Sequence, residues 1–140
     1  MSTTITSTIP TTGSSRTTHP LRLATLVVGV VAAAVTTAFA AIVDAAGVPL
    51  AVDGEAIPLG GFAQMTFLGA VLGGLLAAAL NRYNSRPRHR FMVTTAALTV
   101  ASCVPSVALP PDTATKLALV ASHLIAAAIV IPVVARRTYA

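Results

Sequence analysis

Four long apolar runs, separated by short segments that carry most of the charge, constrain this chain more than any other feature. They cover about residues 23–43, 62–80, 91–109 and 116–135. A bilayer core about 30 Å thick is crossed by about 20 predominantly apolar residues in a helix. With 140 residues, 55% hydrophobic and only 9% charged, the chain has little length left for a soluble domain. The sequence therefore predicts an all-α membrane four-helix bundle built from two antiparallel hairpins.

The charges between these runs are segregated by sign. The acidic residues fall between the first and second runs or between the third and fourth, and they are Asp44, Asp53, Glu55 and Asp112. Lys116 apart, the basic residues fall in the tail, in the middle connector or after the last run, and they are Arg16, Arg22, Arg82, Arg86, Arg88, Arg90, Arg136 and Arg137. Cytoplasmic loops are enriched in Lys and Arg. We therefore predict a multi-pass protein of the bacterial plasma membrane with both termini in the cytoplasm.

The first 20 residues differ in composition from the rest of the chain. They include twelve Ser or Thr residues together with proline and glycine, so they are predicted to form a disordered cytoplasmic tail. Residues 21–137 are predicted to form a single four-span transmembrane domain. An alternative is a cleaved signal peptide, because Ala38-Phe39-Ala40 has the small-x-small form of a cleavage site. The apolar run continues to Val43 without a helix breaker, which favours a retained span, whereas cleavage would leave three spans.

Small residues recur at four-residue spacing in the first two runs. Gly69 and Gly73, together with Gly74, lie in the second run, and Gly29 and Ala33 lie in the first. Such spacing lets the backbones of membrane helices approach closely. We expect these residues to mediate packing within the bundle, and a homodimer contact is the alternative.

Hydroxyl side chains line one face of the third run. Thr95, Thr99, Ser102 and Ser106 recur at i, i+4, i+7 and i+11, which places them along one side of a helix. This face is expected to point into the bundle. Hydrogen bonding to the helix's own backbone is the favoured role, and a polar cavity is the alternative.

His123 is the one readily ionisable side chain well inside a run, and such residues in membranes are often functional. If the third and fourth runs form an antiparallel hairpin, His123 and Ser102 lie at similar depth, so His123 is expected to bond Ser102 or Cys103. Packing through hydrogen bonds is one interpretation. The other is a ligand-binding or proton-binding site that also involves Thr99 and opens toward Asp44 and Gln64.

The residue types present argue against several kinds of site. A single cysteine, Cys103, provides no internal dithiol pair. A haem held by two histidines would need a second membrane histidine, but His19 and His89 lie in segments predicted to be cytoplasmic. No zinc-ligand cluster or serine–histidine–acid set can be placed by spacing, so no catalytic residue, metal site or cofactor is predicted.

Three segments together resemble a known protein family. These are Val52 to Phe62, Pro111 to Lys116, and His123 to Pro132. They are similar to small four-helix actinobacterial integral membrane proteins of unknown function (DUF6069), over roughly residues 21–137. The resemblance implies the four-span topology but no activity. It also singles out Asp112, His123 and Pro132 as positions that match the family pattern.

The leading functional hypothesis is a non-enzymatic structural or accessory bundle. The expected partners are the lipid bilayer, anionic lipids at the basic connector, and a second copy or another membrane protein, with no nucleic acid. The alternative is a small oligomeric transporter or channel that uses His123 and the hydroxyl face of the third run. A membrane enzyme with His123 as general base receives the least support, because no orienting acid accompanies it.

Overall fold

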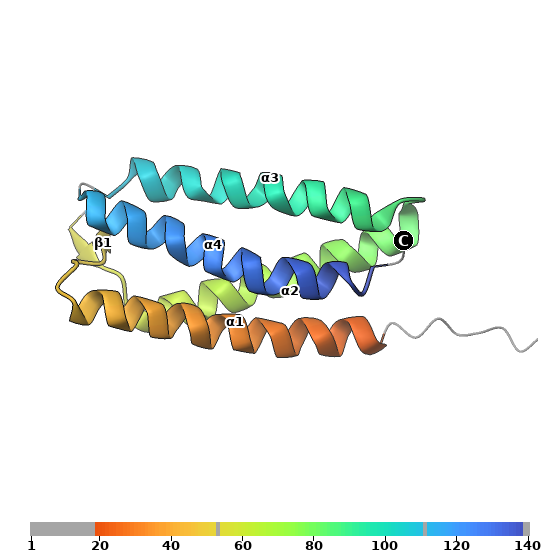
Figure 1. Cartoon of the computed structure of the whole chain (residues 1–140), viewed down its shortest axis with the longest axis horizontal. Coiled ribbons are helices and arrows are strands. Elements are labelled where there is room, and N and C mark those ends of the chain that lie inside the picture. Colours follow the sequence, from red (N-terminus) through yellow and green to blue (C-terminus); the bar gives the residue numbers. More distant parts are fainter. Residues whose placement is uncertain (1–18, 53, 111, 139–140) are drawn as a thin grey trace, which may run out of the picture.

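The computed structural model describes residues 19–52, 54–110 and 112–138, and this part of the chain contains four long helices (Figure 1). They are α1 His19–Ala45, α2 Leu59–Tyr83, α3 Pro87–Ala108 and α4 Thr113–Ala135. The shortest, α3, has 22 residues and is roughly 33 Å long at the usual helical rise. Each helix is therefore long and apolar enough to cross a membrane. The predicted all-α four-helix bundle is confirmed.

The helices extend beyond most ends of the predicted spans. Residues 1–18 of the predicted disordered tail lie outside the described residues, but α1 already begins at His19, inside the segment assigned to that tail. Pro20 is compatible with this start because proline is tolerated in the first turn of a helix. In the basic connector, α2 continues to Tyr83 and α3 begins at Pro87, which leaves only residues 84–86 between the helices.

The long segment between α1 and α2 is not only a loop. It contains a two-stranded antiparallel hairpin, β1 Ala51–Val52 and β2 Glu55–Ala56, which the sequence patterns did not predict. Gly54 in its turn has a φ of +83°, a conformation that glycine adopts readily. Leu50, next to the hairpin, is only 4% exposed and packs with Phe62 and Leu119. The segment is therefore an ordered cap on one end of the bundle, which we call the hairpin end.

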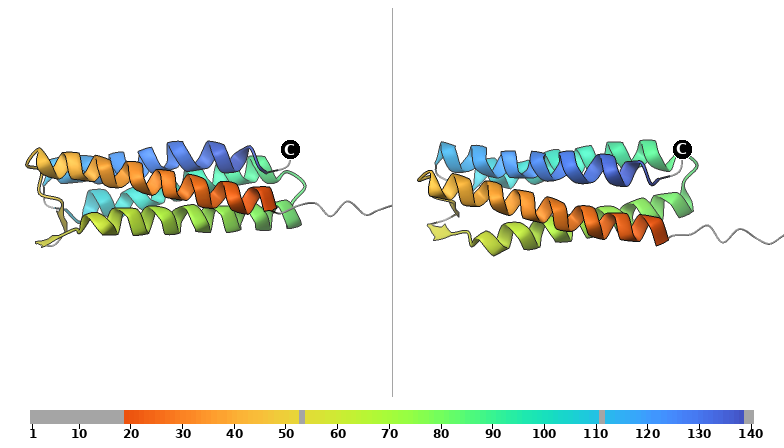
Figure 2. Two further views of the ribbon diagram at one scale, coloured as in Figure 1. Left: turned by 90° about the horizontal axis from the view of Figure 1, so that it is seen from below. Right: turned by 60° about the horizontal axis from the view of Figure 1, so that its bottom comes forward.

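The start of α4 is tied to this cap. The Asp112 carboxylate accepts a hydrogen bond of 2.9 Å from the Thr115 amide, which caps the N-terminus of α4. The Thr115 hydroxyl donates to the carbonyl of Pro49 in the α1–α2 segment. The first described residues of α1, the α2–α3 connector and the end of α4 lie together at the opposite end (Figures 1 and 2). We call this the connector end.

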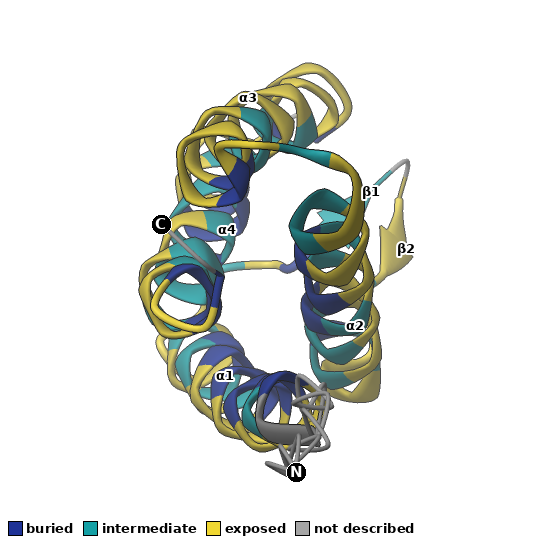
Figure 3. Ribbon diagram, turned by 90° about the vertical axis from the view of Figure 1, so that its right-hand side faces the viewer, coloured by how far each residue is buried: buried dark blue, intermediate teal, exposed yellow. Residues whose placement is uncertain are grey.

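The helices are arranged in a ring in the order α2, α1, α4, α3 (Figure 3). The α1 helix packs along both α2 and α4, and α3 packs mainly on α4. The ring is closed least tightly between α3 and α2. In Figure 1, α2 runs beside α1 near the hairpin end and approaches α3 toward the connector end. This divergence of α2 from α3 determines where the candidate site lies.

The outward faces of the helices are apolar. Leucine and valine side chains are exposed on every helix, among them Leu23 at 66%, Leu72 at 57%, Val100 at 70% and Leu117 at 66%. Exposed positions, in yellow, lie along the outer faces of the helices (Figure 3). Soluble monomers rarely expose apolar surface on this scale, whereas lipid solvates such side chains without cost. The four helices and these faces identify a multi-pass membrane protein.

Two glycines set the close approach of α1 and α2. A Cβ atom at Gly29 would lie 3.1 Å from the Ala70 Cβ and 3.2 Å from the Phe67 ring. At Gly74, a Cβ atom would overlap the Thr25 side chain. Since lipid gives no hydrophobic drive between helices, close backbone contact of this kind must contribute much of the stability.

A hydrogen bond between side chains also joins α1 to α2. The Thr36 hydroxyl is fully buried and donates to the Ala32 carbonyl at 2.9 Å. It lies 3.0 Å from the Thr66 hydroxyl, so Thr66 is the donor of that second bond because the Thr36 proton is already used.

We expect Thr36→Val and Thr66→Val each to destabilise the bundle. The double variant should lose less stability than the sum of the losses in the two single variants. Interhelical bonds in membranes contribute about 0.6 kcal/mol on average, so the coupling should be on the order of 0.5–1 kcal/mol. Reversible unfolding in mixed detergent measures it. A strictly additive double variant would show that the bond does not stabilise the fold.

Candidate functional site

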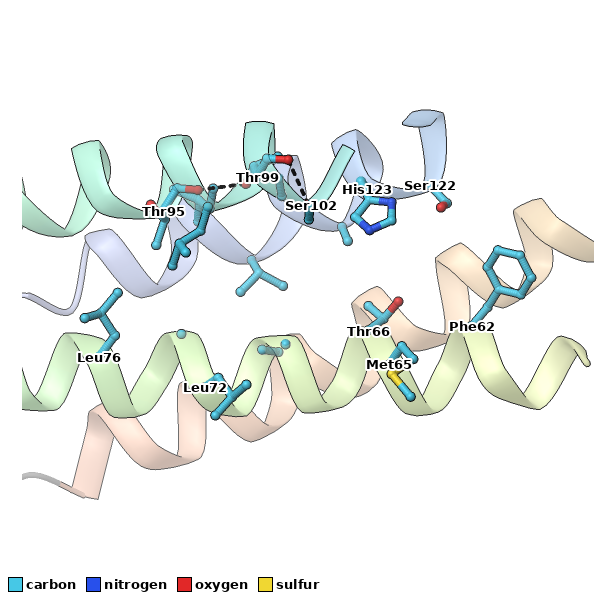
Figure 4. Close-up of a pocket in the computed structure, with 18 of the residues that line it drawn as sticks. Phe62, Met65, Thr66, Leu72, Leu76, Thr95, Thr99, Ser102, Ser122 and His123 are labelled. Atoms are coloured by element: carbon cyan, nitrogen blue, oxygen red, sulfur yellow. Dashed lines mark hydrogen bonds between the residues drawn. The ribbon is translucent and has the colours of Figure 1, made fainter. Parts of the chain in front are cut away.

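A groove of about 910 Å³ lies between α2 and α3, with α4 behind it (Figure 4). On α2 it extends from Gly61 to Leu76, which is roughly 22 Å at the usual helical rise. Phe62, Met65, Leu72 and Leu98 contribute to its mainly apolar walls. Its volume falls within the range of about 300–1,000 Å³ typical of small-molecule sites. The groove is the candidate functional site.

The groove opens sideways and is closed toward the connector end. Met65, Leu72 and Leu98 line it and are exposed, so it opens on the surface of the bundle that faces lipid. Phe91 also lines it but is fully buried, in a cluster with Val130 and Val134. The site is therefore a cleft entered from the membrane and stopped by the Phe91 ring.

Three of the four predicted hydroxyl residues of the third run line this groove. The Thr95 hydroxyl donates to the Phe91 carbonyl at 2.7 Å, Thr99 to the Thr95 carbonyl at 2.8 Å, and Ser102 to the Thr99 carbonyl at 2.8 Å. These bonds to the helix's own backbone are the role that the hydroxyl pattern favours. Ser106, one turn nearer the hairpin end, is buried and is not part of the lining.

His123 projects from α4 into the groove, opposite Thr66 of α2 (Figure 4). Its Nδ1 lies 2.8 Å from the carbonyl oxygen of Leu119, one turn earlier in the same helix. His123 and Ser102 thus share one site, as the depth argument predicted. The expected bond of His123 to Ser102 or Cys103 is not formed among the described residues. The His123 Nδ1 bonds to the Leu119 carbonyl, and the Ser102 hydroxyl donates to the Thr99 carbonyl.

The other candidate ligand-binding residues do not join this cluster. Asp44 and Gln64 are exposed near the hairpin end, and neither lines the groove. Cys103 is half-buried and also lies outside the lining. The residues brought together are therefore His123, Ser102 and Thr99, and none of the described residues that line the groove is the acidic side chain that a proton-relay site would use.

The small residues predicted to pack divide into two groups. Gly29 and Gly74 form the close α1–α2 contact, and Ala33 is buried on α1. In contrast, a Cβ atom at Gly69 or Gly73 would meet nothing within 4 Å, because both glycines line the groove. In this structure Gly69 and Gly73 therefore widen the groove, and they do not mediate the predicted packing between helices of the same chain.

The arginines from which the membrane topology is predicted gather at the connector end. Arg82 lies in the last turn of α2, Arg86 and Arg88 flank the start of α3, and Arg136 and Arg137 follow α4. Arg90 lies in the first turn of α3. The Arg82 guanidinium lies 5.6 Å from the centre of the Tyr83 ring. Among the described residues, no group of three or more His, Cys, Asp or Glu side chains could hold a metal ion.

Sequence patterns did not single out Thr66 or Phe91 as parts of the site. Thr66 is an isolated hydroxyl on a glycine-rich helix, and Phe91 marks the start of an apolar run. Their roles depend on how far α2 diverges from α3, and no periodicity within one helix contains that information. The cluster of His123 with the α3 hydroxyls, by comparison, followed from counting residues along a hairpin.

No match was found among curated proteins or among solved structures. A model described as a family of unknown function (DUF6069) matches residues 16–140, which covers all four helices and the groove. The chain therefore belongs to this family of unknown function.

Proposed function

We propose that the protein is a non-enzymatic accessory bundle that binds an apolar molecule from the bilayer in the groove between α2 and α3. The observation that carries this proposal is the groove itself, which has the volume of a ligand site, is open to lipid and has apolar walls. A ligand that diffuses within the membrane can enter sideways between α2 and α3 without crossing the polar ends of the bundle.

The chemistry of the lining favours binding over catalysis. General acid–base catalysis by His123 would need a nucleophile that it activates or an acidic partner that shares its proton. Its Nδ1 instead bonds to the Leu119 carbonyl, and no carboxylate is among the described residues that line the groove. Ser102 and Thr99 likewise donate to carbonyls of their own helix. These groups can hold a ligand but lack the arrangement that would activate a nucleophile.

We place the connector end in the cytoplasm and the protein in the bacterial plasma membrane. The support is the charge distribution: arginines of α2, α3 and the end of α4 gather at the connector end, whereas Asp44, Glu55 and Asp112 lie near the hairpin end. The same arginines give that end a positive surface that suits anionic lipid headgroups.

The orientation has a direct test. In a Cys103→Ser background, Glu55→Cys should react with a membrane-impermeant maleimide in intact spheroplasts. Ser85→Cys should react only after the membrane is permeabilised. Labelling of Ser85→Cys from outside would reverse the proposed orientation.

Ligand binding is tested by comparing glycine variants. Gly73→Leu places a side chain in the open space of the groove, whereas Gly60→Leu adds the same side chain at an exposed position outside it. Native mass spectrometry of the gently purified protein should show a bound apolar molecule in the wild type and Gly60→Leu, and its loss in Gly73→Leu. Absence of any such molecule from the wild type, or equal retention in Gly73→Leu, would contradict the proposal.

A small oligomeric transporter is the second candidate, because His123 and the α3 hydroxyls do line one cavity. Against it, buried Phe91 stops the groove toward the connector end, so one chain provides a cleft rather than a pore. Proteoliposome flux separates the two functions. We expect the wild type to show no flux. Flux in the wild type that is lost in His123→Ala would instead favour transport.

A further inference from the structure

The hydrogen-bonding capacity left over in the groove points to the chemical class of its ligand, on the premise that the groove binds one as proposed above. A carbonyl oxygen can only accept, so the Nδ1 of His123 must be the donor in its 2.8 Å contact with the Leu119 carbonyl. In the neutral ring, a proton on Nδ1 leaves Nε2 as an acceptor. Among the described residues, Nε2 has no partner, and the ring projects into the groove (Figure 4).

The hydroxyl oxygens around His123, like its Nε2, can only accept a hydrogen bond from a ligand. Thr99 and Ser102 have given their protons to carbonyls of α3, and Ser122 has given its proton to the Leu119 carbonyl at 2.7 Å. Thr66, which faces His123 from α2, donates to Thr36. Each of these oxygens keeps only lone pairs for a ligand. Among the described residues, the polar part of the groove near His123 therefore presents acceptors and no free donor.

Thr94 is the exception, because its hydroxyl makes no hydrogen bond within the described chain. It lies one turn from Phe91 and eight residues from Ser102, which is roughly 12 Å along α3. It is therefore too far away to donate to the group that His123 binds.

The depth of His123 makes an unsatisfied acceptor costly. It lies ten residues after the start of α4, or roughly 15 Å, which is close to the middle of a core about 30 Å thick. Water is scarce at this depth, so a ligand that brings a donor is favoured over a pure hydrocarbon. A helix of another chain would suit the position less well, because its backbone amides already donate within the helix.

The donor must also be uncharged. No Asp, Glu, Lys or Arg is among the described residues that line the groove, so an ammonium or carboxylate group would enter hydrocarbon without a counter-ion. A ketone or an ester carries only acceptors and would face the lone pairs of His123 and Ser102. We propose that the groove binds a long-chain lipid alcohol whose hydroxyl donates to His123 Nε2, with its hydrocarbon chain along the apolar wall of α2.

Matched probes test this assignment. Geranylgeraniol and its methyl ether share one hydrocarbon chain, but only the alcohol has a proton to donate. In nanodiscs, the wild type should bind the alcohol roughly fivefold more tightly, the effect of one neutral hydrogen bond. In His123→Phe, which keeps a ring of similar size without the acceptor, both probes should bind and the preference should disappear.

The possible outcomes separate the two proposals. Equal binding of alcohol and ether by the wild type, or a preference that persists in His123→Phe, overturns the alcohol assignment and leaves the apolar groove standing. If neither probe binds the wild type or Gly60→Leu, groove binding fails and the alcohol assignment fails with it.

A spectroscopic measurement does not depend on the stability of any variant. In the ¹⁵N NMR spectrum of histidine-labelled wild type, the His123 signals should show a protonated Nδ1 and an unprotonated Nε2. The Nε2 signal should move when the alcohol is added and stay in place with the ether. A proton on Nε2 in the free protein, or the same response to both probes, contradicts the proposal.

Discussion

Gly74→Ala is expected to destabilise the bundle by about 1–3 kcal/mol, the usual cost of adding atoms to a packed interface. The new Cβ atom would overlap the Thr25 side chain, whose Oγ1 would lie 2.7 Å and whose Cβ 3.0 Å away. Thr25 cannot easily move aside, because it is 5% exposed and its hydroxyl donates to the Leu21 carbonyl at 2.9 Å. The clash must therefore push α1 from α2. Unfolding in mixed detergent measures the change.

The same helix provides a matched control. Gly69→Ala adds the same methyl group where nothing lies within 4 Å, so it should be neutral or stabilising by up to about 1 kcal/mol, since alanine favours helix more than glycine. Adding Thr25→Ala to Gly74→Ala should restore much of the lost stability. Equal effects of Gly74→Ala and Gly69→Ala would show that the α1–α2 contact does not depend on this glycine.

Phe91→Ala is expected to destabilise the fold by about 3 kcal/mol, near the lower end of the range for replacing a buried phenylalanine with alanine. Phe91 is fully buried and joins a cluster that includes Leu21 of α1, Ala77 of α2 and Val130 of α4. Its removal takes away van der Waals contacts on which a membrane bundle depends. It would also open the closed end of the groove toward the connector. Thermal unfolding in detergent measures the loss of stability.

Val93→Ala is the control for this variant, because Val93 lies on the same helix and is 56% exposed. It should change stability by less than about 0.5 kcal/mol. If Val93→Ala and Phe91→Ala destabilise the protein equally, the cluster around Phe91 does not hold the connector end together.

The relation of sequence to structure differs between the fold and the site. The four helices were predictable, because a membrane span requires a long apolar run and the intervening segments carry charge, proline or glycine. The N-cap at Asp112 could be identified from local residue types. The hairpin between α1 and α2 was missed, since its strands have two residues each and show no alternating pattern. The orientation of the bundle in the membrane stays a prediction.

For the site, residue counting placed His123 and Ser102 at similar depth, and both line the groove. Which small residues pack was not predictable in the same way. Gly73 and Gly74 are neighbours in a run of similar residues, yet one borders open space and the other touches Thr25. A rotation of α2 by one residue would exchange their roles, and neither composition nor spacing determines that rotation.

The local residue types of this chain were enough to identify its spans, because the free energy of placing a segment in lipid depends on that segment's own side chains and backbone. The groove, the partner of Thr36 and the free nitrogen of His123 depended on how four completed helices pack. Lipid solvates outward and inward apolar faces almost equally, so a hydrophobic pattern cannot say which face turns inward. Close van der Waals fit and a few hydrogen bonds select that face, and they exist only once the helices are in contact.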